Sequence, residues 1–129
     1  MRYESPDWSL ELPDGWSHRR NPECATFYAG ADESAFQVSA YRKERDVTDE
    51  DLREFAGEVP LSSVFLPHFG GFETSSTDGD LFQRKWWLRA GRSILFVTYT
   101  CSLANRGKND HVVEAMLRSL TPLYDASEV

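Results

Sequence analysis

Residues 72–102, FETSSTDGDLFQRKWWLRAGRSILFVTYTCS, decide the fold of this chain. Asp78-Gly79 and Ala90-Gly91 divide the stretch, and such dipeptides favour tight turns between strands. The predicted strands span 72–77, 81–89 and 93–102. In the third, residues 94–97 are all apolar, which is typical of a central strand covered on both faces. Consecutive strands joined by short turns pair in the antiparallel sense.

The sequence before this stretch adds four shorter strands and a helix. The predicted strands span 8–12, 16–20, 26–29 and 35–42, with Pro13-Asp14-Gly15 as the first turn and a hairpin around 30–34. The helix begins at Thr48, a good N-cap, and Asp49, Glu50 and Asp51 suit its positive end. Its apolar stripe, at helical spacing, comprises Leu52, Phe55, Ala56 and Val59.

Two segments complete the prediction of secondary structure. Pro60 ends or kinks the first helix, and residues 61–69, followed by Gly70-Gly71, are interpreted as a short helical turn, a loop and a plain turn. A last helix carries Val113, Met116, Leu117 and Leu120 on one face and ends before Thr121-Pro122.

This order of elements predicts one α+β domain over 1–124 with a loose tail over 125–129. We expect a single, mainly antiparallel sheet of about six or seven strands, flanked by helices on both faces. A chain of 129 residues is long enough to bury a core without disulfides.

The net charge of −7 and the absence of any Lys/Arg run longer than two argue against nucleic acid and anionic membranes as partners. No segment has the length and apolarity of a membrane span. Residues 1–7 contain neither the apolar core of a signal peptide nor a lipid-attachment motif. The sequence therefore predicts a cytoplasmic protein.

Two motifs are similar to those of a known superfamily. The opening strand is followed by Pro13-Asp14-Gly15-Trp16, and the closing helix ends in Leu117-Arg118-Ser119-Leu120. With the order of elements, they resemble the PsbP-like (Mog/PsbP) superfamily of α/β/α sandwiches. That family includes photosystem accessory subunits, a small-GTPase cofactor in nuclear transport, bacterial lipoproteins and chaperones for secreted toxins. The resemblance implies a non-enzymatic binding or assembly factor and transfers no functional residue, because Pro13, Gly15 and Trp16 serve the fold.

The residues that usually carry chemistry are scattered along the chain. His18, His68 and His111 lack the spacing of metal ligands, and Asp78-Gly79-Asp80 is explained by turn chemistry. Cys101 with His111 is a poor nucleophile–base pair because no third group orients the imidazole. Cys24 and Cys101 are expected to be buried thiols that pair only if their strands are neighbours. We therefore expect no catalytic residue, no metal and no cofactor.

Two surfaces are candidates for binding a protein. Glu50, Glu54 and Glu58 recur every four residues opposite the apolar stripe, as either a partner surface or a solvated helix face. On the strand 81–89, one face carries Gln83, Lys85, Trp87 and Arg89. Trp87 between two cations is either an exposed binding hot spot or covered by a helix, with long side chains lying along it.

The sequence thus favours a non-catalytic protein-binding module, such as a bacterial chaperone or an accessory or assembly factor. One alternative is an acidic immunity or inhibitor protein that blocks a basic toxin or enzyme, because charge steers such complexes. The other is a small-ligand binder or enzyme whose pocket is assembled from scattered residues.

Overall fold

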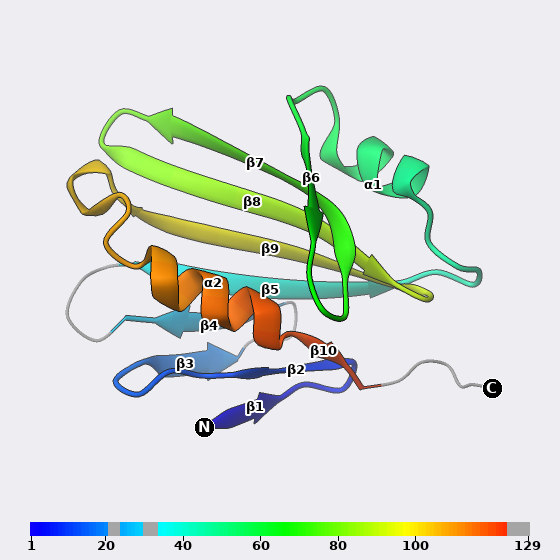
Figure 1. Ribbon diagram of the computed structural model, residues 1–129, viewed down its shortest axis with the longest axis horizontal. Coiled ribbons are helices and arrows are strands. Elements are labelled where there is room, and N and C mark those ends of the chain that lie inside the picture. The colour runs from blue at the N-terminus through cyan, green and yellow to red at the C-terminus, as the bar shows by residue number, and fades with distance from the viewer. Residues whose placement is uncertain (21–23, 30–33, 124–129) are drawn as a thin grey trace.

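The computed structural model describes residues 1–20, 24–29 and 34–123 (Figure 1). The strands are β1 (Arg2–Glu4), β2 (Trp8–Glu11), β3 (Ser17–Arg20), β4 (Ala25–Tyr28), β5 (Ala35–Arg42), β6 (Ser62–Phe65), β7 (Gly70–Asp78), β8 (Leu81–Ala90), β9 (Ser93–Ser102) and β10 (Thr121–Pro122). The α-helices are α1 (Asp49–Ala56) and α2 (Asp110–Ser119), and Leu103–Asn105 forms a 3-10 turn. The turn predicted at 30–33 and the tail at 125–129 lie outside the described residues.

A seven-stranded antiparallel sheet of order β3-β4-β5-β9-β8-β7-β6 forms the centre of the molecule. This confirms the predicted α+β fold. The prediction of a single sheet was wrong, since β2 pairs with β1 and β10 in a separate three-stranded sheet. The segment Thr121–Pro122, predicted only as a helix stop, returns along β2 and takes one of its two edges, while β1 takes the other.

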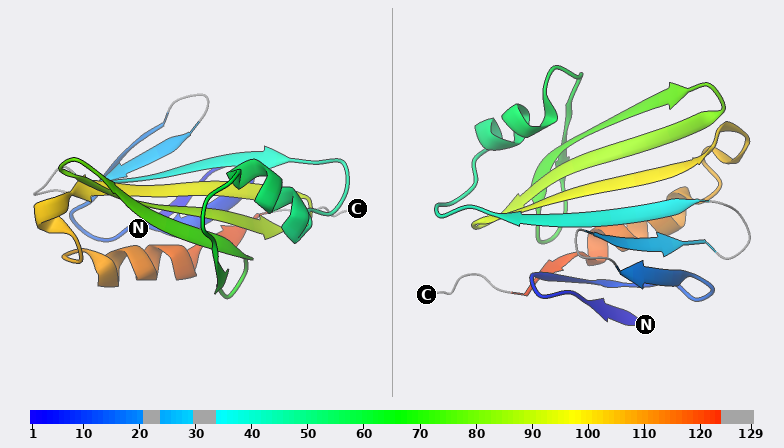
Figure 2. Two further views of the ribbon diagram at one scale, coloured as in Figure 1. Left: turned by 90° about the horizontal axis from the view of Figure 1, so that it is seen from above. Right: turned by 180° about the vertical axis from the view of Figure 1, so that it is seen from behind.

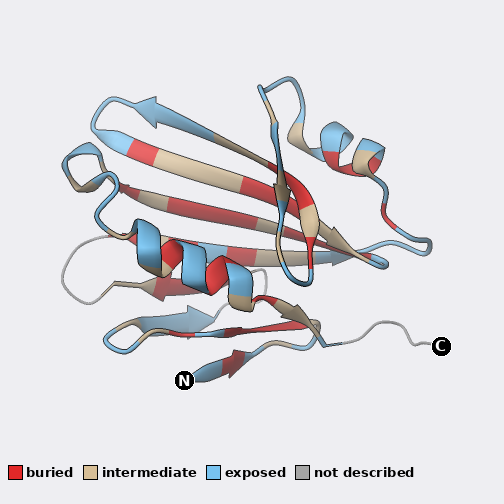
Figure 3. Cartoon of the chain, in the orientation of Figure 1, coloured by how far each residue is buried: buried red, intermediate tan, exposed pale blue. Residues whose placement is uncertain are grey.

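The two faces of the large sheet are covered very differently (Figure 2). Trp86 and Trp87 are neighbours in β8 and point to opposite faces, as the pleat of a strand requires. Trp86 belongs to a large core closed by α2 and the small sheet, whereas Trp87 belongs to a small cluster beneath α1. Figure 3 shows the buried face of α2 turned toward the strands. The larger core includes Val113, Met116 and Leu117 of α2, each no more than 1% exposed.

Helix α1 begins as predicted and ends earlier. Thr48 and Asp51 form a reciprocal capping box at its start. Gly57, with φ of 78°, ends it, because glycine adopts a positive φ without the steric cost that a side chain brings. The predicted stripe is therefore shorter: Leu52 is fully buried, but Phe55 and Val59 are 41% and 40% exposed.

Residues 61–71 differ most from the prediction. Ser62–Phe65 form edge strand β6 rather than a helical turn, and Gly70-Gly71 begin β7 rather than forming a plain turn. A β-carbon on Gly71 would lie 2.0 Å from the carbonyl oxygen of Trp87, so the glycine is needed for close approach of two strands. Neither helix of the described part is long and apolar enough to span a membrane.

Candidate binding surface

The face of the large sheet opposite α2 is largely open. Seen from behind, no described helix crosses its centre, and α1 lies at one corner (Figure 2). The strand register aligns side chains in rows across this face. One row runs through Thr26, Gln37, Thr98, Lys85 and Thr74. We call this the open face.

Hydrogen bonds link neighbouring side chains of the open face. The Gln37 amide donates to Thr26 Oγ1 at 3.1 Å, and the Thr98 hydroxyl donates to Gln37 Oε1 at 3.5 Å. In the adjacent row, the Gln83 amide donates to Thr100 Oγ1 at 3.3 Å. Most of these groups satisfy one another, so the face forms an ordered polar layer without a covering element.

The four residues predicted to share one face of β8 do lie on the same side of the strand, but their environments differ. They are Gln83, Lys85, Trp87 and Arg89. Gln83 and Lys85 are half-buried on the open face, and Lys85 forms no ion pair with another described residue. Trp87 is 4% exposed beneath α1, so of the two alternatives the helix-covered one is observed. Arg89 Nε donates to Asp49 Oδ1 at 2.7 Å, which ties it to α1.

Four aromatic rings form a continuous series at the border between α1 and the open face. Ring centroids are 5.3 Å apart for Tyr41 and Phe55, 5.7 Å for Phe55 and Phe96, and 5.5 Å for Phe96 and Trp87. These separations are favourable for aromatic pairs. Tyr41 and Phe55 at the outer end are 46% and 41% exposed. We call this series the aromatic step.

A cleft of about 390 Å³ opens beside the outer end of the aromatic step. Its rings are those of Tyr41 and Phe55, and Ile94 is a buried apolar residue in its lining. Arg42, Lys43, Asp51 and Glu54 complete the lining. The cleft thus combines apolar contact area with charges of both signs, a composition suited to an apolar side chain flanked by polar groups.

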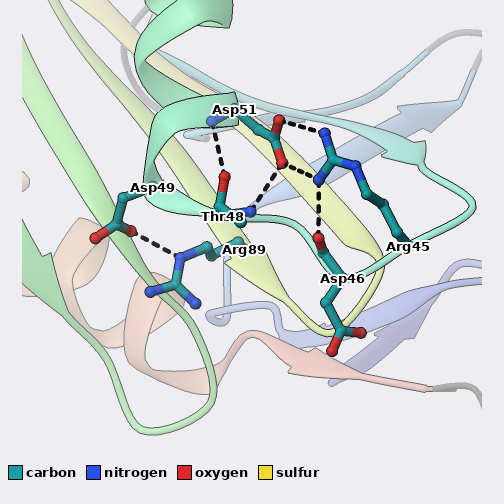
Figure 4. A network of polar contacts seen from close by, with 6 residues as sticks. All are labelled: Arg45, Asp46, Thr48, Asp49, Asp51 and Arg89. Carbon is teal, nitrogen blue, oxygen red and sulfur yellow. Dashed lines mark hydrogen bonds and ion pairs between the residues drawn. The ribbon is translucent and has the colours of Figure 1, made fainter.

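Polar contacts hold the start of α1 next to this cleft (Figure 4). Arg45 donates from Nη1 and Nη2 to the two carboxylate oxygens of Asp51 at 2.7 and 2.8 Å, and the Thr48 N–H donates to Asp51 at 2.8 Å. These bonds, first of all that from Arg45, hold the pKa of the Asp51 carboxyl well below its usual range. The Asp51 charge is therefore fully paired, whereas Glu54 forms no ion pair within the described residues.

The predicted acidic ridge is not continuous. Glu50 and Glu54 lie on the exposed surface of α1, but Glu58 follows the Gly57 cap and is outside the helix. Glu50 is also 3.8 Å from Arg53 Nη1, one turn along. The helix therefore presents two glutamates, one of them next to a cation.

Within the described residues, no three His, Cys, Asp or Glu side chains come together as metal ligands. Cys101 is buried on the α2 side of β9, while His111 is exposed at the start of α2. Strand β5 lies between β4, which Cys24 precedes, and β9, so the two cysteines are not cross-strand neighbours.

Sequence reasoning missed Tyr41, Phe55 and Phe96 as candidate binding residues. Phe55 was assigned to the buried stripe, and Tyr41 and Phe96 were placed in predicted strands without being singled out. The signal that identifies Phe55 is the cap at Gly57, which shortens the helix and leaves Phe55 at the border of the covered region.

No model of a known protein family matches the chain, and no curated protein matches it significantly. Among the solved structures that share its fold are two from different bacteria. A Bacteroides thetaiotaomicron protein matches with a TM-score of 0.72 at 13% identity over 95% of this chain and 47% of its own. LpqN of Mycobacterium tuberculosis, described as involved in cell envelope biogenesis, matches with a TM-score of 0.62 at 11% identity over 95% of this chain and 89% of its own. The chain thus spans about half of the Bacteroides protein, and both likenesses concern the fold.

Proposed function

We propose that this chain is a non-catalytic protein-binding module of the chaperone or accessory-factor type. Its partner would contact the aromatic step and the adjoining cleft. The observation that carries the proposal is the exposure of Tyr41 and Phe55 beside a cleft, at the border of an uncovered sheet face. Aromatic residues at the centre of an interface contribute much of its binding energy.

The partner surface that fits is a polypeptide segment with an apolar side chain between charged ones. The apolar group would enter the cleft between Tyr41 and Phe55, while Lys43 and Glu54 would meet charges on either side. The polar layer of the open face would then form the rim, where Lys85 is available for an ion pair. A polar rim around an aromatic centre is the usual arrangement of non-obligate interfaces.

Two further points support this proposal. The order of strands and helices is compatible with the PsbP-like resemblance, whose members act mainly as binding or assembly factors. LpqN, which shares the fold, is described as involved in cell envelope biogenesis, and that description is compatible with an accessory role. The acidic-inhibitor alternative is weaker, because Glu58 lies off the helix and Glu50 is close to Arg53.

The test compares two exposed apolar positions at opposite ends of the molecule. A photo-crosslinking phenylalanine analogue replaces Phe55 in one protein and Leu103 in another, since these residues are 41% and 40% exposed. After irradiation in lysate of the source organism, we expect a defined adduct from position 55 and none from position 103. The adduct is identified by mass spectrometry, and the identified partner is then purified for direct binding.

Binding of the purified partner is next measured with the double variant Tyr41→Ser/Phe55→Ser and with Leu103→Ser. We expect the double variant to weaken binding at least about thirtyfold, since two aromatic contacts at an interface centre are each worth about 1–2 kcal/mol or more. Leu103→Ser should bind like the wild type. Equal binding by all three proteins, with unchanged thermal melting, would contradict the proposal.

A further inference from the structure

Strand β7 is covered along only part of its outer edge. β6 pairs with residues 70–73, and the rest of β7, Thr74–Asp78, extends beyond it (Figure 1). Pro60 lies near this point, and β6 begins only at Ser62. The sheet therefore has a step in its edge, with a hollow of about 340 Å³ beside Ser62 and Ser75.

The register determines which backbone groups face this step. The Leu66 N–H donates to the Phe69 carbonyl at 2.8 Å, and hydrogen-bonded pairs alternate along an antiparallel ladder. Glu73 and Gly71 are therefore the β7 residues whose backbone groups point toward β6. By the same alternation, Ser75 and Thr77 point their N–H and C=O groups outward, where β6 is absent.

The composition of this free edge is unusual for an exposed one. Natural edge strands are protected by lysine, proline or a bulge, but residues 74–77 are Thr-Ser-Ser-Thr, without charge or proline. Residues 75–78 are exposed, and Thr74 is half-buried. Asp78, at the end of the free edge, is its one charged residue. In a chain with a net charge of −7, two copies can therefore meet along residues 74–77 with little direct repulsion.

We propose that this free edge pairs with the same edge of a second copy of this chain. A two-fold axis at Ser76 places Ser75 opposite Thr77 of the second copy, and Thr77 opposite its Ser75. Both residues already point their backbone groups outward, so this register forms four intermolecular hydrogen bonds. Ser–Thr pairs across antiparallel strands add to the pairing.

The register also matches the length of the step. Thr74 of one copy faces Asp78 of the other, so the five free residues pair over their whole length. The hairpin turn of the second copy, Gly79-Asp80, then lies at the hollow where β6 begins. A two-fold contact of this kind is self-limiting, because each copy uses its one stepped edge on the partner's step.

The first experiment is a cysteine crosslink that reports the register. At the two-fold axis, Ser76 faces its own copy as a non-hydrogen-bonded pair with Cα atoms about 4.5 Å apart, within the range for a disulfide. We expect Ser76→Cys to form a disulfide-linked dimer in a glutathione buffer, and mass spectrometry to find the peptide in which the two introduced cysteines are joined. Thr74→Cys, two residues away on the same strand, should not crosslink to itself.

The second experiment removes the edge donor. Because the Ser75 N–H points outward, Ser75→Pro leaves the pairing of β7 with β8 intact, and proline is accepted at edge positions. We expect sedimentation equilibrium to show a dimer of wild-type protein at high concentration, and Ser75→Pro to raise its dissociation constant at least about tenfold. Ser63→Pro, an outward-facing edge position on β6, is the matched control and should retain the dimer.

Each other outcome overturns the proposal. Wild-type protein that stays monomeric up to about millimolar concentration, where weak pairs associate, would exclude the second copy as occupant. If Ser75→Pro dimerised as strongly as the wild type, the contact would lie elsewhere. The same would follow if Thr74→Cys crosslinked as efficiently as Ser76→Cys. Hydrogen exchange gives a further check. If the Ser75 and Thr77 amides were protected from exchange only when another protein is present, the edge would belong to an interface with that protein instead. Because the edge lies away from the cleft, Tyr41→Ser/Phe55→Ser should not affect the dimer.

Discussion

The two helices are attached to the large sheet by different kinds of contact. Helix α2 buries Val113, Met116 and Leu117 in the large core. Helix α1 buries one leucine, Leu52, packs the partly exposed Phe55 against Phe96, and is tied to β8 by the Asp49–Arg89 ion pair. Apolar burial scales with area, whereas exposed ion pairs are worth little. The α2 side is therefore the more strongly packed half of the molecule, and the α1 corner, to which we assign binding, is the more weakly attached half.

The largest expected effect comes from the close approach of β7 to β8 beneath α1. A β-carbon at Gly71 would lie 2.0 Å from the Trp87 carbonyl oxygen and 3.1 Å from Leu52 Cδ1. Because the first of these is backbone, the two strands must separate. We expect Gly71→Ala to lower the free energy of unfolding by about 3 kcal/mol or more, measured by urea denaturation. At Gly70 the nearest atom is 4.0 Å away, so Gly70→Ala should cost far less. Similar losses for both variants would show that the close approach at Gly71 does not matter.

A smaller effect on stability is expected from substitutions at two adjacent residues of β9 that point to opposite faces of the sheet. Val97 is fully buried on the α2 side, and Thr98 is 9% exposed on the open face. Val97→Thr places a hydroxyl in the apolar core and should cost about 1–3 kcal/mol. Thr98→Val removes the hydroxyl that donates to Gln37 and should change stability by less than about 1 kcal/mol.

Thermal and urea unfolding of both variants provide the comparison. The two substitutions exchange the same groups, a hydroxyl and a methyl, so side-chain size does not differ between them. If Thr98→Val were the more destabilising, the open face would be part of the structural core rather than a polar surface.

The sequence predicted the parts of the fold that local chemistry determines. The Asp78-Gly79 turn, the alternation in β8 and the Thr48 cap are all present where their patterns indicate. The pairing of β2 with β1 and β10 was not predicted, because it depends on the return of the chain after α2, which local patterns do not contain. The β6 strand was missed because a short apolar run with flanking prolines is compatible with a turn, a helix or an edge strand.

The candidate site was predicted in part. The sequence placed Gln83, Lys85, Trp87 and Arg89 on one face of a strand, because strand periodicity is local. It left open whether Trp87 is exposed, since the answer depends on where α1 packs. Phe55 was assigned to the core for the same reason: a helical stripe indicates which residues face the sheet, but not how far the sheet extends beneath them.

The smallest expected effect concerns the polar contacts at the start of α1 and depends on pH. The pKa of Asp51 is lowered in the folded protein, mainly by the hydrogen bonds from Arg45. A lowered pKa means that the carboxylate stabilises the fold at pH values above the unfolded pKa of about 4. This contribution is lost progressively as the pH falls below that value and the group is protonated. The stability difference between wild type and Asp51→Asn should therefore be constant from neutral pH to about pH 5 and shrink at lower pH.

Urea unfolding of both proteins over this pH range measures the difference and cancels the titration of all other carboxyl groups. Glu50→Gln is the control, because Glu50 is on the same helix but 74% exposed, and its difference from wild type should vary much less with pH. A difference for Asp51→Asn that does not shrink in acid would mean that the Arg45 pair contributes no more than a neutral hydrogen bond. The attachment of α1 would then depend on Leu52, the aromatic step and the Asp49–Arg89 pair, and the contrast between the two helices would be mainly one of buried area.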